Sequence, residues 1–151
     1  MFTVGVRASL GVAGGLRGGV SMSVDGSASG AAAAVATYDV VARLQAQELD
    51  RDGSVFDVDV LRAGLGAVIR ELDSVDFAAD ARFEAEFGGR APTGELLARH
   101  LHRRLSSKLP VIAGFPLIRR GTLTVSVEDT RGSFASFAAP VRGAPPPGPR
   151  R

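Results

Sequence analysis

The side chains able to bind a metal or transfer a proton are few in this chain of 151 residues. It contains no cysteine, which excludes disulfides, thiolate metal ligands and a cysteine nucleophile. Its two histidines are His100 and His102. On a helix, residues two apart point about 200° away from each other, so these imidazoles cannot chelate one ion. We therefore interpret both as surface or interface histidines.

The remaining candidate chemistry depends on carboxylates that adjoin predicted elements. Asp129 follows a predicted strand, Glu95 lies in the first turn of a predicted helix, and Asp73 follows another helix. Carboxylates can act as general acids or bases, and they accept paired hydrogen bonds from N–H donors. Each also has a structural interpretation: Asp129 as a strand-end residue facing a turn, and Glu95, with Thr93, as part of a helix cap.

Composition excludes several other function classes. The glycines between positions 11 and 19 are not a phosphate loop, because no Lys-Ser/Thr pair and no helical pattern follow them. The formal charge is only +2 and Lys108 is the sole lysine, so we expect no nucleic-acid partner. We find no signal peptide and no run of ~20 apolar residues, and expect a cytoplasmic protein without membrane contact. The Ala/Arg/Gly-rich, lysine-poor composition is typical of a GC-rich bacterial genome.

These candidates must be positioned by four strands. Apolar residues occupy alternate positions over 2–12 and again over 36–45, and this period of two predicts strands with one buried face. A loop is expected over 14–30, and Asp50 to Gly53 predict a turn. Two further alternating segments, 122–127 and 133–139, predict the closing strands on either side of a turn at Arg131-Gly132.

Two helices are predicted between the strand pairs. Apolar spacing of three and four over 58–72 indicates one helix, which Asp57 would cap. The second begins near Pro92-Thr93 and is expected to end by Leu109. Segments 74–90 and 109–120 are interpreted as connections. The first of these would be anchored in the core by its three phenylalanines, Phe77, Phe83 and Phe87.

The element order is therefore ββααββ, which predicts a two-layer α+β domain: a four-stranded antiparallel sheet with two helices on one face. Residues 1–140 would form this domain. Residues 141–151 form a Pro/Gly/Arg tail that we expect to be disordered, because it has too little apolar content to order itself. The edges of such a sheet invite pairing, so we expect a homo-oligomer joined through strand edges.

With four segments in this order, the chain resembles the 6-pyruvoyl tetrahydropterin synthase / 6-carboxytetrahydropterin synthase family, which has the tunnelling fold. Residues 1–7 resemble the family's opening strand, and Gly53–Asp57 resembles its G-x-V-x-D turn. Pro92–Ala98 resembles P-T-x-E-x-x-A at the second helix. Val125–Thr130 resembles V-x-V-x-E-T in the third strand, with Asp129 in place of the family's glutamate.

The resemblance implies a zinc ion held by three histidines, with a cysteine and an Asp-His pair that move protons. In this sequence the zinc positions fall on Gly14, Ala34 and Ala36, and the cysteine falls near Ala28. The Asp-His pair reads Asp73-Ser74. None of the zinc positions has a side chain able to bind metal, so we expect no zinc and regard Asp73 as a remnant of the catalytic set.

The resemblance also implies a pterin anchor, because the family's glutamate holds the 2-amino-pyrimidine edge through paired hydrogen bonds. Asp129 matches that position with an arm one methylene shorter, and Thr93 and Glu95 would line the same pocket. We therefore expect a homologue without the zinc-dependent lyase activity that keeps a pterin- or purine-sized pocket and forms an oligomer, as in the family's hexamer.

Two alternatives stay open from the sequence. The protein could be a metal-free lyase that processes pterins, with Asp73, Asp129 and Glu95 as its acid/base groups. It could instead be a structural or interaction module without a ligand.

Overall fold

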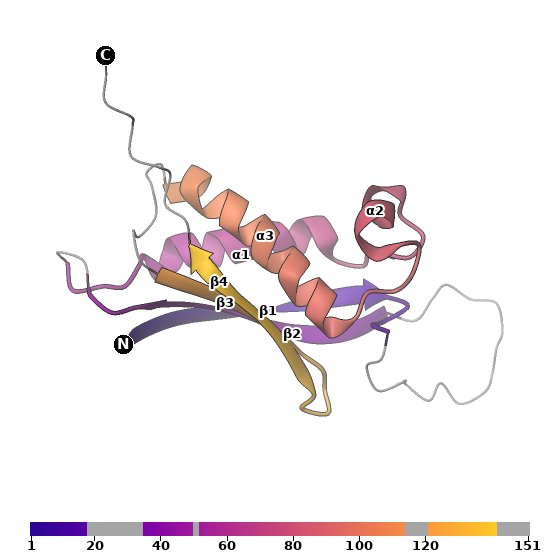
Figure 1. Ribbon diagram of the computed structural model, residues 1–151, viewed down its shortest axis with the longest axis horizontal. Coiled ribbons are helices and arrows are strands. Elements are labelled where there is room, and N and C mark those ends of the chain that lie inside the picture. Colours follow the sequence, from indigo (N-terminus) through magenta and orange to yellow (C-terminus); the bar gives the residue numbers. More distant parts are fainter. Residues whose placement is uncertain (18–34, 50–51, 114–120, 142–151) are drawn as a thin grey trace, which may run out of the picture.

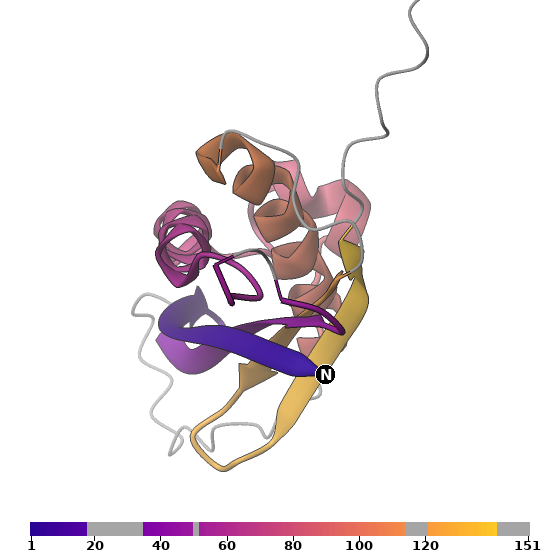
Figure 2. The same ribbon diagram turned by 90° about the vertical axis from the view of Figure 1, so that its left-hand side faces the viewer.

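The computed structural model describes residues 1–17, 35–49, 52–113 and 121–141. Its elements follow the predicted order, with a sheet below and helices above (Figures 1 and 2). They are β1 (Phe2–Ala13), β2 (Val35–Ala46), α1 (Val58–Leu72), the 3₁₀ helix η1 (Ala81–Phe83), α2 (Glu84–Phe87), α3 (Gly94–Ala113), β3 (Gly121–Glu128) and β4 (Phe134–Val141). The predicted α+β fold is confirmed, with η1 and α2 added between the two long helices.

The sheet is antiparallel, and its strands lie in the order in which they occur along the chain, β1-β2-β3-β4. Representative pairs are Val6 with Ala42, Asp39 with Glu128, and Val125 with Phe137. β4 continues through Val141, one residue beyond the predicted end of the domain. The predicted tail from 142 and most of the predicted 14–30 loop lie outside the described residues.

Period-two alternation assigns the two faces of the sheet, as predicted. The helix-facing side chains form the core together with both long helices. Core residues with no exposed surface include Leu10, Val40, Ala42, Leu61, Val68, Leu97, Leu105, Leu123 and Val125. The opposite face carries hydroxyl groups on β3 and an ion pair, with 3.7 Å between Arg7 Nη1 and Asp39 Oδ2. One face is therefore dry and the other polar.

Both predicted helix starts are confirmed by capping hydrogen bonds. Asp57 accepts from the Asp59 amide at 2.9 Å at the start of α1. Thr93 Oγ1 accepts from the Leu96 amide at 3.2 Å at the start of α3. Each bond satisfies one of the amides that a helix leaves without a partner in its first turn.

The predicted end of the second helix near Leu109 is wrong, because α3 continues through Ala113 with Pro110 inside it. Proline removes one helical hydrogen bond and disfavours a helical conformation at the preceding residue. Leu109 is nevertheless fully buried in the core. Its packing outweighs the local preference of the sequence. Among the described residues, no helix is long and apolar enough to cross a membrane.

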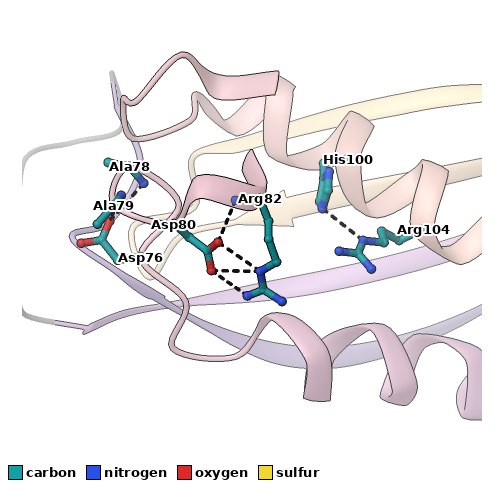
Figure 3. A network of polar contacts seen from close by, with 7 residues as sticks. All are labelled: Asp76, Ala78, Ala79, Asp80, Arg82, His100 and Arg104. Atoms are coloured by element: carbon teal, nitrogen blue, oxygen red, sulfur yellow. Dashed lines mark hydrogen bonds and ion pairs between the residues drawn. The ribbon is translucent and has the colours of Figure 1, made fainter. Parts of the chain in front are cut away.

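The 74–90 connection is anchored by its phenylalanines, as predicted. Phe77 contacts Phe83 and Phe87 edge-on, with ring centroids 4.9 and 5.5 Å apart. The same segment is shaped by short-range polar bonds, including an ion pair of 2.6 Å between Asp80 Oδ2 and Arg82 Nη2 (Figure 3). These bonds fold the segment back over α3.

The interpretation of the histidines as surface residues is wrong. His100 and His102 are each only 6% exposed. The phenylalanine cluster encloses the His100 ring, which lies 5.3 Å from the Phe83 ring. His102 lies on the other side of α3, where its ring is 5.0 Å from that of Phe137 on β4. The two imidazoles do diverge, as predicted, but both point into the protein.

His100 is held as a neutral donor. Arg104 Nε donates to its Nε2 at 3.4 Å (Figure 3), and its Nδ1 lies 2.6 Å from Glu86 Oε2. Because Nε2 accepts, the proton belongs on Nδ1 and is donated to Glu86. Burial lowers the pKa of His100, and the nearby Glu86 carboxylate only partly offsets this.

Candidate functional site

A cleft of about 350 Å³ opens at the end of the sheet where α3 begins and β3 turns into β4. Three segments far apart in the sequence supply its walls. The lining residues are Leu16, Arg17, Tyr38, Thr93, Gly94, Glu95, Val127, Asp129, Ser133, Phe134 and Ala135. The three residues predicted to bind a ligand, Thr93, Glu95 and Asp129, are therefore brought together in one cleft.

The floor of the cleft comes from neighbouring strands. The β2–β3 ladder ends with the pair Asp39 and Glu128, so the next pair in the same register is Tyr38 and Asp129. Side chains alternate along a strand, which places both of these on the helix-facing side, as it does Val127. Val127 is 3% exposed and closes the bottom of the cleft with an apolar surface.

Asp129 combines the two interpretations that the sequence left open. Its Oδ1 accepts from the amides of Arg131 and Ser133, at 2.8 and 2.9 Å, and so organises the turn between β3 and β4. Gly132 supplies the positive φ of +87° that this turn needs. Within the described part of the chain, no donor contacts Oδ2 of Asp129. One carboxylate oxygen is thus structural, and the other is free to accept from a ligand.

The first turn of α3 forms one wall of the cleft, beside the β3–β4 turn that holds Asp129. Thr93 Oγ1 accepts from a backbone amide, which leaves its hydroxyl proton available to an acceptor in the cleft. Glu95 is exposed at the rim. The helix starts close against β4, because a Cβ added at Gly94 would lie 3.0 Å from the Cβ of Ala135. Glycine at position 94 therefore keeps this end of the cleft open.

The third wall is the segment after β1, which folds back over the floor. The Leu16 amide donates to the Tyr38 hydroxyl oxygen at 3.1 Å, and the Arg17 amide donates to the carbonyl of Pro92 at 2.8 Å. These bonds tie the segment to β2 and to the entrance of α3. Sequence reasoning missed Leu16, Arg17 and Tyr38 as site residues. The one available signal was the chain's single tyrosine on the core-facing side of a strand.

The family's zinc does not fit the residues present. Gly14, at one of the three zinc positions, is exposed and has no atom within 4 Å of an added Cβ. Ala36, at another, has only a methyl group, and Ala34 and Ala28 lie outside the described residues. Among the described residues, no group of three or more His, Cys, Asp or Glu side chains could hold a metal ion. Both histidines point into the core on α3.

Asp73 does not line the cleft. Its Oδ1 accepts from the Gly11 amide at 2.8 Å, and the Ser74 amide donates to the Gly11 carbonyl at 2.8 Å. Ser74 adopts a left-handed φ of +61°, which is unusual for a residue with a side chain. The Asp73-Ser74 pair thus joins the end of α1 to β1.

Comparison with known proteins agrees with this geometry. The family model described as 6-pyruvoyl tetrahydropterin synthase matches residues 36–139. The structure of Caenorhabditis elegans 6-pyruvoyl tetrahydropterin synthase is similar, with a TM-score of 0.62 over 91% of this chain and 95% of that one. The sequence identity is 17%, so this similarity shows the fold alone. No curated protein sequence gives a significant match.

Proposed function

The chain belongs to the 6-pyruvoyl tetrahydropterin synthase family, and we propose that it is a member that binds a planar, pterin- or purine-sized heterocycle without zinc-dependent lyase activity. The observation that carries this proposal is the cleft beside Asp129. It has an apolar surface at Val127, a carboxylate oxygen of Asp129 without a donor among the described residues, and the hydroxyl groups of Tyr38 and Thr93. A volume of about 350 Å³ lies within the range of small-molecule sites.

The charges at the cleft favour a heterocycle that carries both donors and acceptors. Asp129 and Glu95 offer carboxylate oxygens to amino and ring N–H groups, while Arg17 and Thr93 offer donors. A carboxylate paired with an amino-pyrimidine edge gives charge-assisted hydrogen bonds, which are stronger than neutral ones. Because only Oδ2 of Asp129 is free, we expect a single strong bond at this position and a weaker hold than a free glutamate would give.

The chemistry of the donor set supports the proposed loss of the lyase reaction. The reaction in the family needs a metal to polarise the substrate side chain. Here the matching positions carry glycine and alanine, and the chain has no cysteine to transfer a proton. The metal-free lyase is less well supported, because one of its three acid/base groups, Asp73, is engaged with the Gly11 amide outside the cleft.

Self-association is the second part of the proposal. β1 and β4 are the edges of the sheet in the described chain. The end of β1 is already bonded to residues 73–75 through Gly11 and Ala13, so β4 and the earlier part of β1 are the open edges. Exposed edges favour pairing with another chain. We expect a homo-oligomer joined through these edges, built from one domain over residues 1–140 with the Pro/Gly/Arg tail outside it.

Thermal unfolding with a panel of pterins and purines tests the proposal. A ligand that binds only the folded state, at a hundredfold excess over its dissociation constant, raises the free energy of unfolding by ~2.7 kcal/mol. For a chain of this length that corresponds to a rise in Tm of roughly 5–10 °C.

Asp129→Asn is the matched variant for this measurement. It keeps the acceptor of the turn at Oδ1 and replaces the free oxygen with an amide donor. The rise in Tm caused by the ligand should therefore fall sharply, while the Tm without ligand stays the same. If no compound in the panel raises the Tm of the wild-type protein, the interaction module without a ligand becomes the better account.

A further inference from the structure

We infer that Tyr38 is a specificity-determining residue of the cleft and that its hydroxyl donates a hydrogen bond to an acceptor on the ligand, most simply an oxo oxygen. The inference rests on the proposed function and adds to it the chemistry that the ligand must present. Tyr38 is the single tyrosine of the chain and lies in the cleft floor at the start of β2.

The direction of the Tyr38 hydroxyl follows from the partner it already has. A phenol oxygen can accept hydrogen bonds and carries one proton to donate. The Leu16 amide donates to this oxygen at 3.1 Å, so an acceptor site is already used. Among the described residues, no acceptor takes the phenol proton. Tyr38 lines the cleft, so a ligand acceptor placed beside its hydroxyl would complete its hydrogen bonding.

The polar groups of Tyr38 and Asp129 have different partners around the cleft. An extension of the β2–β3 register makes Tyr38 and Asp129 neighbours, but their side chains bond to different segments that line the cleft. The Tyr38 hydroxyl reaches the Leu16 amide, whereas the Asp129 carboxylate reaches the amides of Arg131 and Ser133. A flat ligand lying on this floor therefore meets a donor at one side and an acceptor at the other.

The surroundings of the hydroxyl also agree with a ligand position there. A Cβ added at Gly15 would lie 3.4 Å from the Tyr38 hydroxyl and 3.7 Å from the Cβ of Ala36. No side chain at Gly15 fills this space, and its φ of +68° disfavours any other residue. The hydroxyl thus lies among small residues, where a ligand atom can approach it closely.

The two polar sides make a prediction about ligand class. Amino or ring N–H groups should face Asp129 and a carbonyl oxygen should face Tyr38, as an amino-oxo heterocycle allows. A diamino heterocycle would present a donor to the donor of Tyr38 and should bind less well. Discrimination of this kind is strong when a site is built to form a hydrogen bond that the wrong ligand leaves unmade.

The test is a calorimetric titration of wild-type protein and Tyr38→Phe with pterin and with 2,4-diaminopteridine. Phenylalanine keeps the ring and removes the hydroxyl. We expect the variant to bind pterin roughly five- to twentyfold more weakly and to lose much of its preference for pterin over the diamino compound.

Each other outcome is decisive. If Tyr38 acts only by holding the Leu16 segment, the variant will lose affinity for both compounds by the same factor, and the assignment as a ligand donor is overturned. Unchanged affinity for pterin overturns it as well and leaves the proposed function standing. If the wild-type protein binds neither compound, this inference is overturned. The proposed function fails as well only if the panel of pterins and purines also gives no rise in Tm.

Discussion

Acidification should destabilise this protein well before its carboxylates titrate, because two imidazoles are buried in the neutral form. Burial lowers the pKa of both His100 and His102 from the ordinary value of 6.5. Below that value the unfolded chain binds protons that the folded chain does not, so stability is present above pH 6.5 and is lost as the pH falls.

The magnitude follows from the linkage relation. When the pH falls from 7.5 to 5.5, one histidine that stays neutral in the folded state lowers the free energy of unfolding by at most ~1.4 kcal/mol. Two such histidines lower it by at most ~2.7 kcal/mol. His100 is surrounded by Phe77, Phe83 and Phe87, with the Glu86 carboxylate and the Arg104 guanidinium beside it. Burial among these rings and the Arg104 cation disfavour protonation of the imidazole, and the Glu86 carboxylate opposes this only in part.

His102 contributes independently on the other side of α3. Its ring packs on Phe137, its Nδ1 lies 3.5 Å from Ser106 Oγ, and its Nε2 has no hydrogen-bond partner within the described residues. Glu71 has a lowered pKa because Lys108 donates to its carboxylate, and its contribution is lost only as the pH falls below about 4.5. The window from 7.5 to 5.5 therefore reports on the histidines.

The assay is urea denaturation at pH 7.5, 6.5 and 5.5 at constant ionic strength, with the same measurements on His102→Gln. The wild-type unfolding free energy should fall by up to ~2.7 kcal/mol across the range, and the variant should lose about half as much. The comparison is between the slopes of unfolding free energy against pH, so a loss of stability that the substitution causes equally at every pH does not affect it. A free energy that stays level or rises on acidification would refute the assignment of two buried neutral imidazoles.

Five further substitutions, two of them controls, test the packing around the cleft and the core by denaturant unfolding. Gly94→Val should cost about 1–3 kcal/mol and narrow the cleft, because an added side chain meets β4, whereas Gly66→Ala in α1 should be neutral or stabilising by about 0.5–1 kcal/mol. Phe77→Ala should cost about 3–5 kcal/mol, because the ring is 1% exposed at the centre of the aromatic cluster. Thr93→Ala should cost about 0.5–2 kcal/mol and Thr93→Ser much less, because only serine keeps the capping oxygen.

Local patterns in the sequence were sufficient to predict the sheet and both helix starts. Period two in the strands and a capping residue at Asp57 and Thr93 are signals that act over a few residues. The course of α3 past Pro110 was not predictable in this way. It depends on the burial of Leu109 by other parts of the fold, and packing of this kind has no local signature.

The lining of the cleft was foreseen in part, because the resemblance to the family pointed to Asp129, Glu95 and Thr93, which line one cleft. Their role in binding a ligand stays a prediction. Tyr38 was missed, because its role depends on the Leu16 segment folding back over β2. The histidines were misplaced for a similar reason. A helix rich in arginine is expected to be exposed, and only the fold shows that the aromatic connection of residues 74–90 covers His100.

The claim that a pterin-synthase scaffold has lost its metal chemistry is tested most directly by the zinc content and turnover of the same purified sample. Zinc is quantified per chain by mass spectrometry, and the protein is then assayed with 7,8-dihydroneopterin triphosphate. We predict zinc far below one equivalent per chain and no turnover, even after incubation with added zinc. One tightly held zinc per chain together with turnover would contradict the account.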